Sequence, residues 1–367
     1  MRRFCGSAAQ GRARIGKDDP FVLIGTHAEE NEAPRAKTAR PAVWFLVRLS
    51  VGIALIAYLA RSRIIDFHSL LKPIAAWPID LAAVSLIFLD VVLMAARLSM
   101  LFKPQGLQLS FANSLKLTLV SSFFATFLPG AAGGDLAKLF YAAKENKGRR
   151  AEIVTVVIFD RAIGLFSILI LPLLFAPLFR PLIRDVAVLR MLLIAAVILA
   201  LCMLAGLILC LRSPAALSRL LEWGFRFLPG KKLAERSIAS VAAYRGHARV
   251  LVAALGLSLL ANLTLIGATA LAIWALHPAS MSMKMCLVIP LGDLANNLPL
   301  TPGGLGVGES AYSVLFKLAG LEGGAEALLC WRIWRAAVGL LGLILYLRGP
   351  GRSVYGSEAG AGESGTA

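Results

Sequence analysis

Two acidic residues that follow glycine-rich breaks have the clearest potential for chemistry in this chain. The first break spans residues 128–135 and ends in Asp135, and the second spans 301–309 and ends in Glu309. A carboxylate at the start of a helix either caps the helix by accepting its first N–H groups or takes part in binding an ion there. Asp135 and Glu309 are expected to contact a substrate at the breaks, together with Gly133, Gly134, Thr301, Gly303 and Gly304.

Among the arginines inside apolar segments, where a charge is costly and marks a functional position, three follow the breaks: Arg161, Arg332 and Arg335. Arg161 would either clamp two oxygens of a phosphate with its planar guanidinium or pair structurally with Asp135 or Asp160. Arg332 and Arg335 follow the second break at about the interval that separates Arg161 from the first. Arg332 is therefore a second candidate for substrate binding, whereas Arg335 could instead extend toward the membrane surface.

Two further acids lie within apolar segments. Asp90 is near the middle of its segment, with Arg97 seven residues later on the same helical face, and Asp160 directly precedes the first arginine. A buried acid of this kind is either a structural partner of a neighbouring helix or a proton or cation site. Asp90, Asp160 and Arg335 are accordingly candidates for ion coupling or for structural pairing.

Polar residues also cluster before the second break. The amides of Asn296 and Asn297, close to Asp293, are expected to satisfy the backbone of a broken helix rather than to bind cargo. Glu309 would pair with Arg332 or take up a coupling proton.

The composition places these residues in a membrane. The chain has 367 residues, of which 58% are hydrophobic and 16% charged, and its mean hydropathy is +0.75. About 20 apolar residues span a bilayer. Six segments meet this length, at 42–60, 79–99, 153–178, 188–211, 250–276 and 328–348.

Two shorter apolar runs end at the glycine-rich breaks. They cover 117–128 and 287–300, and the short helical segments 136–143 and 310–318 follow them. A helix, a Pro/Gly turn and a returning helix form a re-entrant hairpin, and paired broken segments are typical of inverted-repeat transporters.

The distribution of basic residues supports this topology. If neither hairpin crosses and the amino terminus is cytoplasmic, the cytoplasmic segments hold 26 Lys and Arg and the outer segments 8. The two hairpins then enter from opposite sides. The sequence thus predicts an all-α polytopic membrane protein with six spanning helices and two re-entrant helical hairpins, eight apolar segments arranged as an inverted repeat, with both termini in the cytoplasm.

The expected domain organisation follows from these segments. A flippase-like transmembrane domain is flanked by two disordered tails, and its cytoplasmic loop mixes basic and bulky apolar residues as an amphipathic surface helix does. The boundaries are 1–41 for the first tail, 42–348 for the domain, about 42–178 and 188–348 for the two repeats, 212–249 for the loop and 349–367 for the last tail.

Several function classes find no support in the residues. The net charge of +17 is divided among short clusters between apolar runs, which favours contact with anionic membrane lipids over nucleic acid. The five cysteines show no metal-ligand spacing, and the four histidines lie away from the breaks. We therefore expect no catalytic residues, no metal and no cofactor.

The motifs resemble those of the lysylphosphatidylglycerol synthase transmembrane-region family, flippase-like integral membrane proteins. The resemblance covers about 42–348, and its carriers are 129–135 (PGAAGGD), 160–164 (DRAIG) and 299–306 (PLTPGGLG) with Glu309. It implies movement of lipids or lipid-linked head groups across the bacterial inner membrane. Relatives of this stand-alone size, without the aminoacyl-transfer domain, include proteins associated with hopanoid lipids.

Three classes of function remain. The favoured class is a lipid transporter for a phospholipid, a polyprenyl-phosphate-linked lipid or a hopanoid lipid. The alternatives are an ion-coupled carrier of a small solute and an accessory subunit that works with lipid-biosynthesis enzymes.

Overall fold

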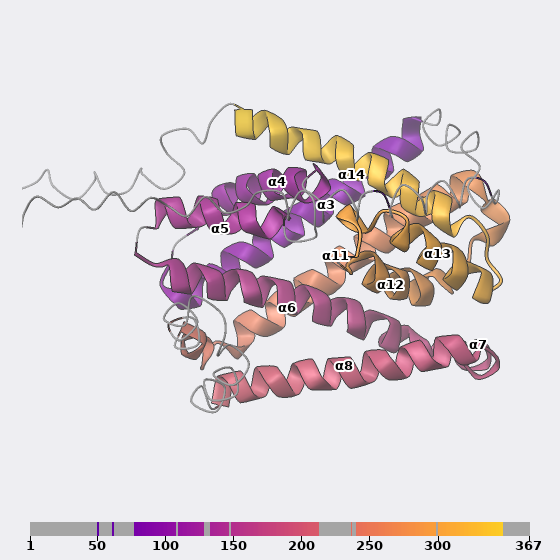
Figure 1. Ribbon diagram of the computed structural model, residues 1–367, viewed down its shortest axis with the longest axis horizontal. Coiled ribbons are helices and arrows are strands. Elements are labelled where there is room, and N and C mark those ends of the chain that lie inside the picture. The colour runs from indigo at the N-terminus through magenta and orange to yellow at the C-terminus, as the bar shows by residue number, and fades with distance from the viewer. Residues whose placement is uncertain are drawn as a thin grey trace, which may run out of the picture. The chain divides into compact units, whose positions relative to one another are not determined.

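The computed structural model describes residues 77–107, 109–127, 133–146, 148–212, 240–298 and 300–347, with the single residues Ser50, Arg61 and Arg236. Every regular element in these ranges is a helix (Figure 1). The α-helices are α3 (Trp77–Phe102), α4 (Phe111–Phe127), α5 (Gly133–Glu145), α6 (Arg150–Phe175), α7 (Arg180–Asp185), α8 (Ala187–Arg212), α11 (Ala248–Leu276), α12 (Met285–Asn296), α13 (Val307–Leu318) and α14 (Gly324–Leu347). Short 3-10 helices are η1 (Lys103–Gln105), η2 (Ala176–Phe179), η3 (Ala242–Tyr244), η4 (Pro278–Ser280) and η5 (Pro302–Gly304).

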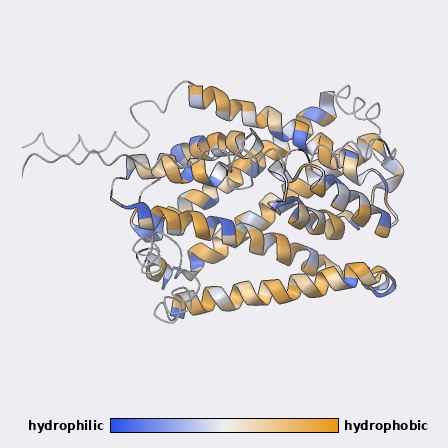
Figure 2. Ribbon diagram, viewed as in Figure 1, coloured by the Kyte–Doolittle hydropathy of each residue, from blue (hydrophilic) through white to orange (hydrophobic). Residues whose placement is uncertain are grey.

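Five helical stretches are long and apolar enough to cross a membrane. They are Trp77–Gln105, Arg150–Asp185, Ala187–Leu209, Ala248–Leu276 and Gly324–Leu347. Hydrophobic residues run along their length in Figure 2. They coincide with five of the six predicted spans. The sixth, 42–60, lies outside the described residues except for Ser50, and both predicted tails lie outside them entirely. The chain is an all-helical, multi-pass membrane protein.

Each predicted break separates two short helices that pack against each other. In the first half α4 contacts α5 across residues 128–132, which lie outside the described part, and in the second half α12 contacts α13 across a turn that contains η5. The predicted start of the first run at residue 117 was wrong, because α4 begins at Phe111. Ser114 and Thr118 remain in the helix because Ser114 donates to the carbonyl of Ala95 at 2.9 Å and Thr118 to that of Ser114 at 2.8 Å.

Helices of one half pack against those of the other. α3 contacts α11 along most of its length, α4 contacts α14, and α12 contacts α6. The α4–α14 contact brings backbones together, since a Cβ on Gly342 would collide with the carbonyl of Leu119. Small residues allow such close approach between membrane helices.

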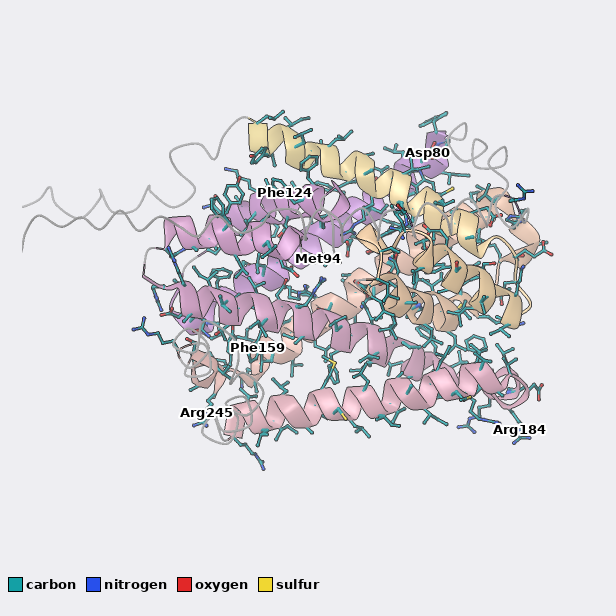
Figure 3. The ribbon with its side chains drawn as sticks, viewed as in Figure 1. Asp80, Met94, Phe124, Phe159, Arg184 and Arg245 are labelled. Atoms are coloured by element: carbon teal, nitrogen blue, oxygen red, sulfur yellow. The ribbon has the colours of Figure 1, made fainter. Side chains whose placement is uncertain are left out.

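The short segment before α11, which contains η3, contacts the ends of α3 and α8 and the middle of α6. The buried hydroxyl of Tyr244 donates to the carbonyl of Leu101 at 2.8 Å, and its ring stacks on Phe159 with centroids 4.4 Å apart. Burial raises the pKa of the Tyr244 phenol above its ordinary value, so it remains a neutral donor. Arg245 donates to the carbonyls of Leu211 and Arg212 at the end of α8. Figure 3 shows Phe159 and Arg245 at this end and Arg184 at the other.

Within the predicted cytoplasmic loop 212–249 the structure describes the carboxyl end, where η3 and the start of α11 lie. The predicted amphipathic helix falls mainly on 213–235 and 237–239, outside the described residues.

Candidate functional site

Glu309 is both a helix cap and an ion-pair partner at the second break. It lies in the first turn of α13 with its side chain fully buried. Its Oε2 accepts the N–H of Gly306 at 2.7 Å, and its Oε1 accepts the Nε of Arg332 at 2.6 Å. A carboxylate is favoured here because the amino end of a helix is electropositive. The capping role and the pairing with Arg332 thus occur together.

The guanidinium of Arg332 joins α14 to the tip of the second hairpin. Its Nη1 donates to the carbonyl of Gly303 at 2.6 Å, and its Nη2 donates to Oδ1 of Asn296 at 2.7 Å. Glycine is needed beside this contact, because a Cβ on Gly308 would come within 2.6 Å of the same Asn296 oxygen. Arg332 therefore binds both arms and the turn of the hairpin.

The other predicted residues of the second break shape its backbone. Thr301 is buried, and its hydroxyl donates to the carbonyl of Leu305 at 2.8 Å. Gly303 and Gly304 have φ values of 59° and 70°, the left-handed conformation that residues with a side chain rarely adopt. A Cβ on Gly304 would also collide with the carbonyl of Asn296.

The first half has a comparable acid–arginine pair. Asp135 lies in the first turn of α5, and its Oδ2 is 3.1 Å from the Nε of Arg161 on α6. This pair is more open than its counterpart, because the side chains are 22% and 42% exposed. Gly133 and Gly134 begin α5, and the carbonyl of Gly134 accepts the hydroxyl of Ser121 at 2.8 Å, which joins the two arms.

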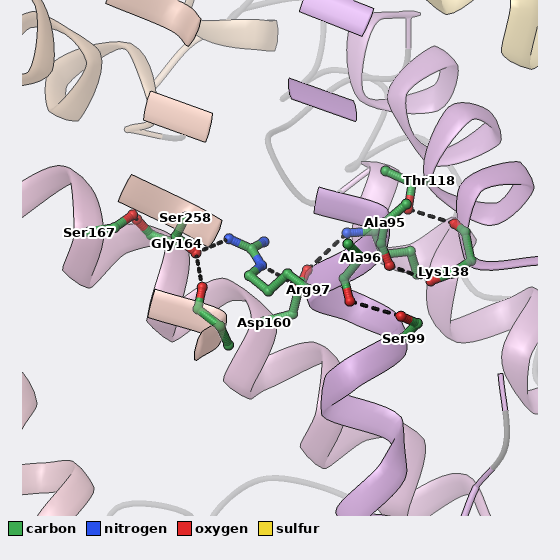
Figure 4. A network of polar contacts seen from close by, with 12 residues as sticks. Ala95, Ala96, Arg97, Ser99, Thr118, Lys138, Asp160, Gly164, Ser167 and Ser258 are labelled. Carbon is green, nitrogen blue, oxygen red and sulfur yellow. Dashed lines mark hydrogen bonds and ion pairs between the residues drawn. The ribbon is translucent and has the colours of Figure 1, made fainter. Parts of the chain in front are cut away.

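Asp160 belongs to a buried network beside this pair (Figure 4). Its Oδ1 is 2.7 Å from the Nε of Arg97, and its Oδ2 is 3.0 Å from the Nζ of Lys138. Arg97 also donates to the hydroxyl of Ser258 on α11 at 2.7 Å. Gly164 makes room for the guanidinium, since a Cβ there would lie 3.3 Å from its Nη1. This network connects α3, α5, α6 and α11.

Asp90 and Arg335 pair with each other across α3 and α14. Arg335 Nη1 is 3.4 Å from Asp90 Oδ2, and its guanidinium lies 5.1 Å from the ring centroid of Trp331. Arg335 thus reaches inward to α3, and the alternative in which it extends to the membrane surface was wrong. Although Asp90 and Arg97 share a helical face, each pairs with a different helix.

The Asp293 carboxylate is surrounded by amides. Nδ2 of Asn296 donates to Oδ1 at 3.1 Å, and Nδ2 of Asn297 donates to Oδ2 at 3.0 Å. Asn297 also donates to the backbone carbonyl of Asp293 at 2.9 Å. The prediction that these amides satisfy the backbone of the broken helix is therefore confirmed only for the bond from Asn297 to the Asp293 carbonyl.

Sequence reasoning missed Lys138 as a member of the site, and it assigned Asn296 to the backbone of the broken helix rather than to the contact with Arg332. Lys138 follows Asp135 by three residues, a spacing that puts both side chains on one helical face, and their charged atoms are 4.0 Å apart. Its reach to Asp160 depends on how α5 packs on α6. Asn296 carried no comparable signal, because its contact with Arg332 depends on the fold of the hairpin.

The charged residues form two clusters of opposite balance. In the cluster at the first break three bases, Arg97, Lys138 and Arg161, accompany Asp135 and Asp160. In the cluster at the second break two bases, Arg332 and Arg335, accompany three acids, of which Asp293 and Glu309 belong to the second half and Asp90 comes from α3 of the first half. Within the described ranges, no three His, Cys, Asp or Glu side chains are grouped as metal ligands. The first cluster thus has an excess of positive charge and the second an excess of negative charge when all of these groups are ionised.

Comparison with known proteins identifies the family. No curated protein and no solved structure matches the chain. The family model described as the lysylphosphatidylglycerol synthase TM region matches residues 45–345, which include every side chain of the site and both breaks. The chain belongs to the lysylphosphatidylglycerol synthase transmembrane-region family.

Proposed function

We propose that this protein moves the polar head group of a membrane lipid across the bacterial inner membrane. The cargo would be a phospholipid, a polyprenyl-phosphate-linked lipid or a hopanoid lipid. The observation that carries the proposal is the repeated pairing of an acid on the second helix of each hairpin with an arginine on the next spanning helix: Asp135 with Arg161 and Glu309 with Arg332.

The exposure of Arg161 supports a polar pathway. It lies within a stretch able to span the membrane, and 42% of its side chain is exposed. A guanidinium facing hydrocarbon at that depth would be costly, whereas one facing a water-filled path is solvated. Its planar donors match two oxygens of a phosphate, and an incoming phosphate would compete with Asp135 for them.

The packing between the halves supports an inverted repeat. The first hairpin contacts the last span of the second half, and the second hairpin contacts the last span of the first half. A two-fold axis in the membrane plane produces this exchange, and transporters built in this way hold cargo near the midplane. In this topology the hairpins are re-entrant and both termini are cytoplasmic.

The protein acts in this proposal as a non-catalytic transporter. Its partners are membrane lipids, preferentially anionic ones, and enzymes of lipid biosynthesis could supply or consume its cargo. Nucleic acid has no part in it. A small-solute carrier and an accessory subunit are the alternatives that the test must separate.

Translocation in proteoliposomes tests the proposal. Purified protein would be reconstituted with head-group-labelled anionic or zwitterionic phospholipid, and a membrane-impermeant quencher added outside. We expect quenching beyond the outer-leaflet fraction. Arg161→Ala should slow it about tenfold or more, because charge-assisted hydrogen bonds to the phosphate are lost.

The matched control is Arg184→Ala, which removes an exposed arginine from α7 at the end of the membrane domain. This variant should translocate lipid at the wild-type rate. Folded wild-type protein that moves none of the labelled lipid classes would overturn the proposal in favour of the two alternatives.

A further inference from the structure

Asp293 is an acid at the unfavourable end of its helix. It lies in the last turn of α12, where the helix dipole is negative, whereas Asp135 and Glu309 occupy first turns, where the dipole is positive. A carboxylate in this position is stabilised by a positive charge or by a proton.

No base provides that charge by direct contact. The residue is 7% exposed, and among the described residues no Lys, Arg or His nitrogen lies within 4 Å of its carboxylate. The buried acids Asp160 and Glu309 each have a basic partner at 3.0 Å or less. Burying a charge with neutral amides as its nearest partners is costly, and neutralisation relieves that cost.

A buried hydroxyl beside this acid lacks a hydrogen-bond partner. Tyr312 on α13 is fully buried, and its hydroxyl has no partner in the described structure. Its ring packs on α12 directly before the acid, since a Cβ on Gly292 would lie 2.6 Å from the ring. Buried polar groups are rarely left unpaired, so this hydroxyl indicates a missing donor or acceptor.

We propose that Asp293 is the proton-binding site that couples lipid movement to a proton gradient, an inference that rests on the proposed function. A proton from water adds to the carboxylate, and the resulting neutral acid offers an O–H that the Tyr312 hydroxyl can accept. The site suits a proton rather than a metal ion. Both carboxylate oxygens already receive an amide N–H, whereas Na⁺ or Ca²⁺ requires a shell of oxygen ligands.

Asn296 connects this acid to the head-group site. Its Nδ2 donates to Asp293 while its Oδ1 accepts from Arg332, which pairs with Glu309. The charges that act on Asp293 come from Arg335 and Arg332 on α14 and from Asp90 on α3. The helix α13, which packs on α12, carries Glu309 and Tyr312. With Asp90, Asp293 and Glu309 ionised beside Arg332 and Arg335, the cluster at the second break has one excess negative charge. Protonation of Asp293 removes it, so a proton and an anionic head group favour each other's binding.

Infrared difference spectroscopy tests the proton site without lipid transport. Purified protein titrated from acidic to alkaline pH should show a protonated carboxyl band that persists above the ordinary titration range of an aspartate and disappears as the pH rises further. The band should be missing in Asp293→Asn and present in the control Asp185→Asn, an exposed acid on α7. A spectrum of Asp293→Asn identical to the wild type would overturn the assignment.

Transport under a gradient tests the coupling. With one proton per lipid, a gradient of one pH unit should change the leaflet distribution of labelled anionic lipid about tenfold, and an equal Na⁺ gradient should not. Asp293→Asn should lose this response and Asp185→Asn retain it. Translocation that ignores the pH gradient would overturn the coupling and leave the proposed function intact. A titrating Asp293 in protein that moves no lipid would instead overturn the proposed function.

Discussion

Replacing the acid of each pair by its amide should affect stability very differently in the two halves. In Glu309→Gln, the amide can accept from only one of its two present donors, the Nε of Arg332 and the N–H of Gly306. The other donor then faces an NH₂ group in a fully buried position. Breaking a buried ion pair costs about 3–5 kcal/mol, and because Arg332 is 18% exposed we expect the lower end, about 3 kcal/mol.

In Asp135→Asn the corresponding loss should be below about 1 kcal/mol, because both partners are partly exposed and water can replace the bond. The free energy of unfolding in detergent micelles, from denaturant titration followed by tryptophan fluorescence, measures both variants. Equal losses, or a neutral effect of Glu309→Gln, would refute the role given to burial here.

Two further predictions concern packing and the buried network. Gly342→Ala should lower the unfolding free energy by about 1–3 kcal/mol, because the new Cβ collides with the Leu119 carbonyl. The control Gly206→Ala, whose Cβ meets no atom within 4 Å, should be neutral or slightly stabilising. Equal midpoints of the two variants in thermal unfolding would count against the close α4–α14 contact. Asp160→Asn should lower the unfolding free energy by about 3–5 kcal/mol, because Arg97 and Lys138 are buried and lose their counter-charge. A denaturation midpoint equal to that of the wild type would show that the network contributes little to stability.

The sequence predicted the helices well because their signal is local. Apolar runs of membrane-spanning length and Pro/Gly breaks mark where helices lie and where they stop, without knowledge of the tertiary fold. The start of α4 was missed because its first polar residues are satisfied by contacts within and between helices that hydropathy does not report.

Charge partners were predictable only where the two halves repeat. Glu309 and Arg332 follow the second break at about the intervals at which Asp135 and Arg161 follow the first. The structure pairs Glu309 with Arg332, which was one of the two alternatives predicted for this acid. The pairing of Asp90 with Arg335, 245 residues away, and of Arg97 with Asp160 depends on how α3 crosses α14 and α6. Such crossings are properties of the packed fold, and one sequence does not reveal them.

Lipid transport through the proposed polar path requires that Arg161 face water within the membrane. In a cysteine-free background, Arg161→Cys and Ile198→Cys would be treated in sealed vesicles with a charged, membrane-impermeant thiol reagent. Ile198, in the middle of the apolar helix α8, is 57% exposed and serves as the lipid-facing control. We predict that Arg161→Cys reacts in the intact membrane and Ile198→Cys only after denaturation. If both cysteines remain unmodified until the protein is denatured, no polar path reaches Arg161 and the account is contradicted.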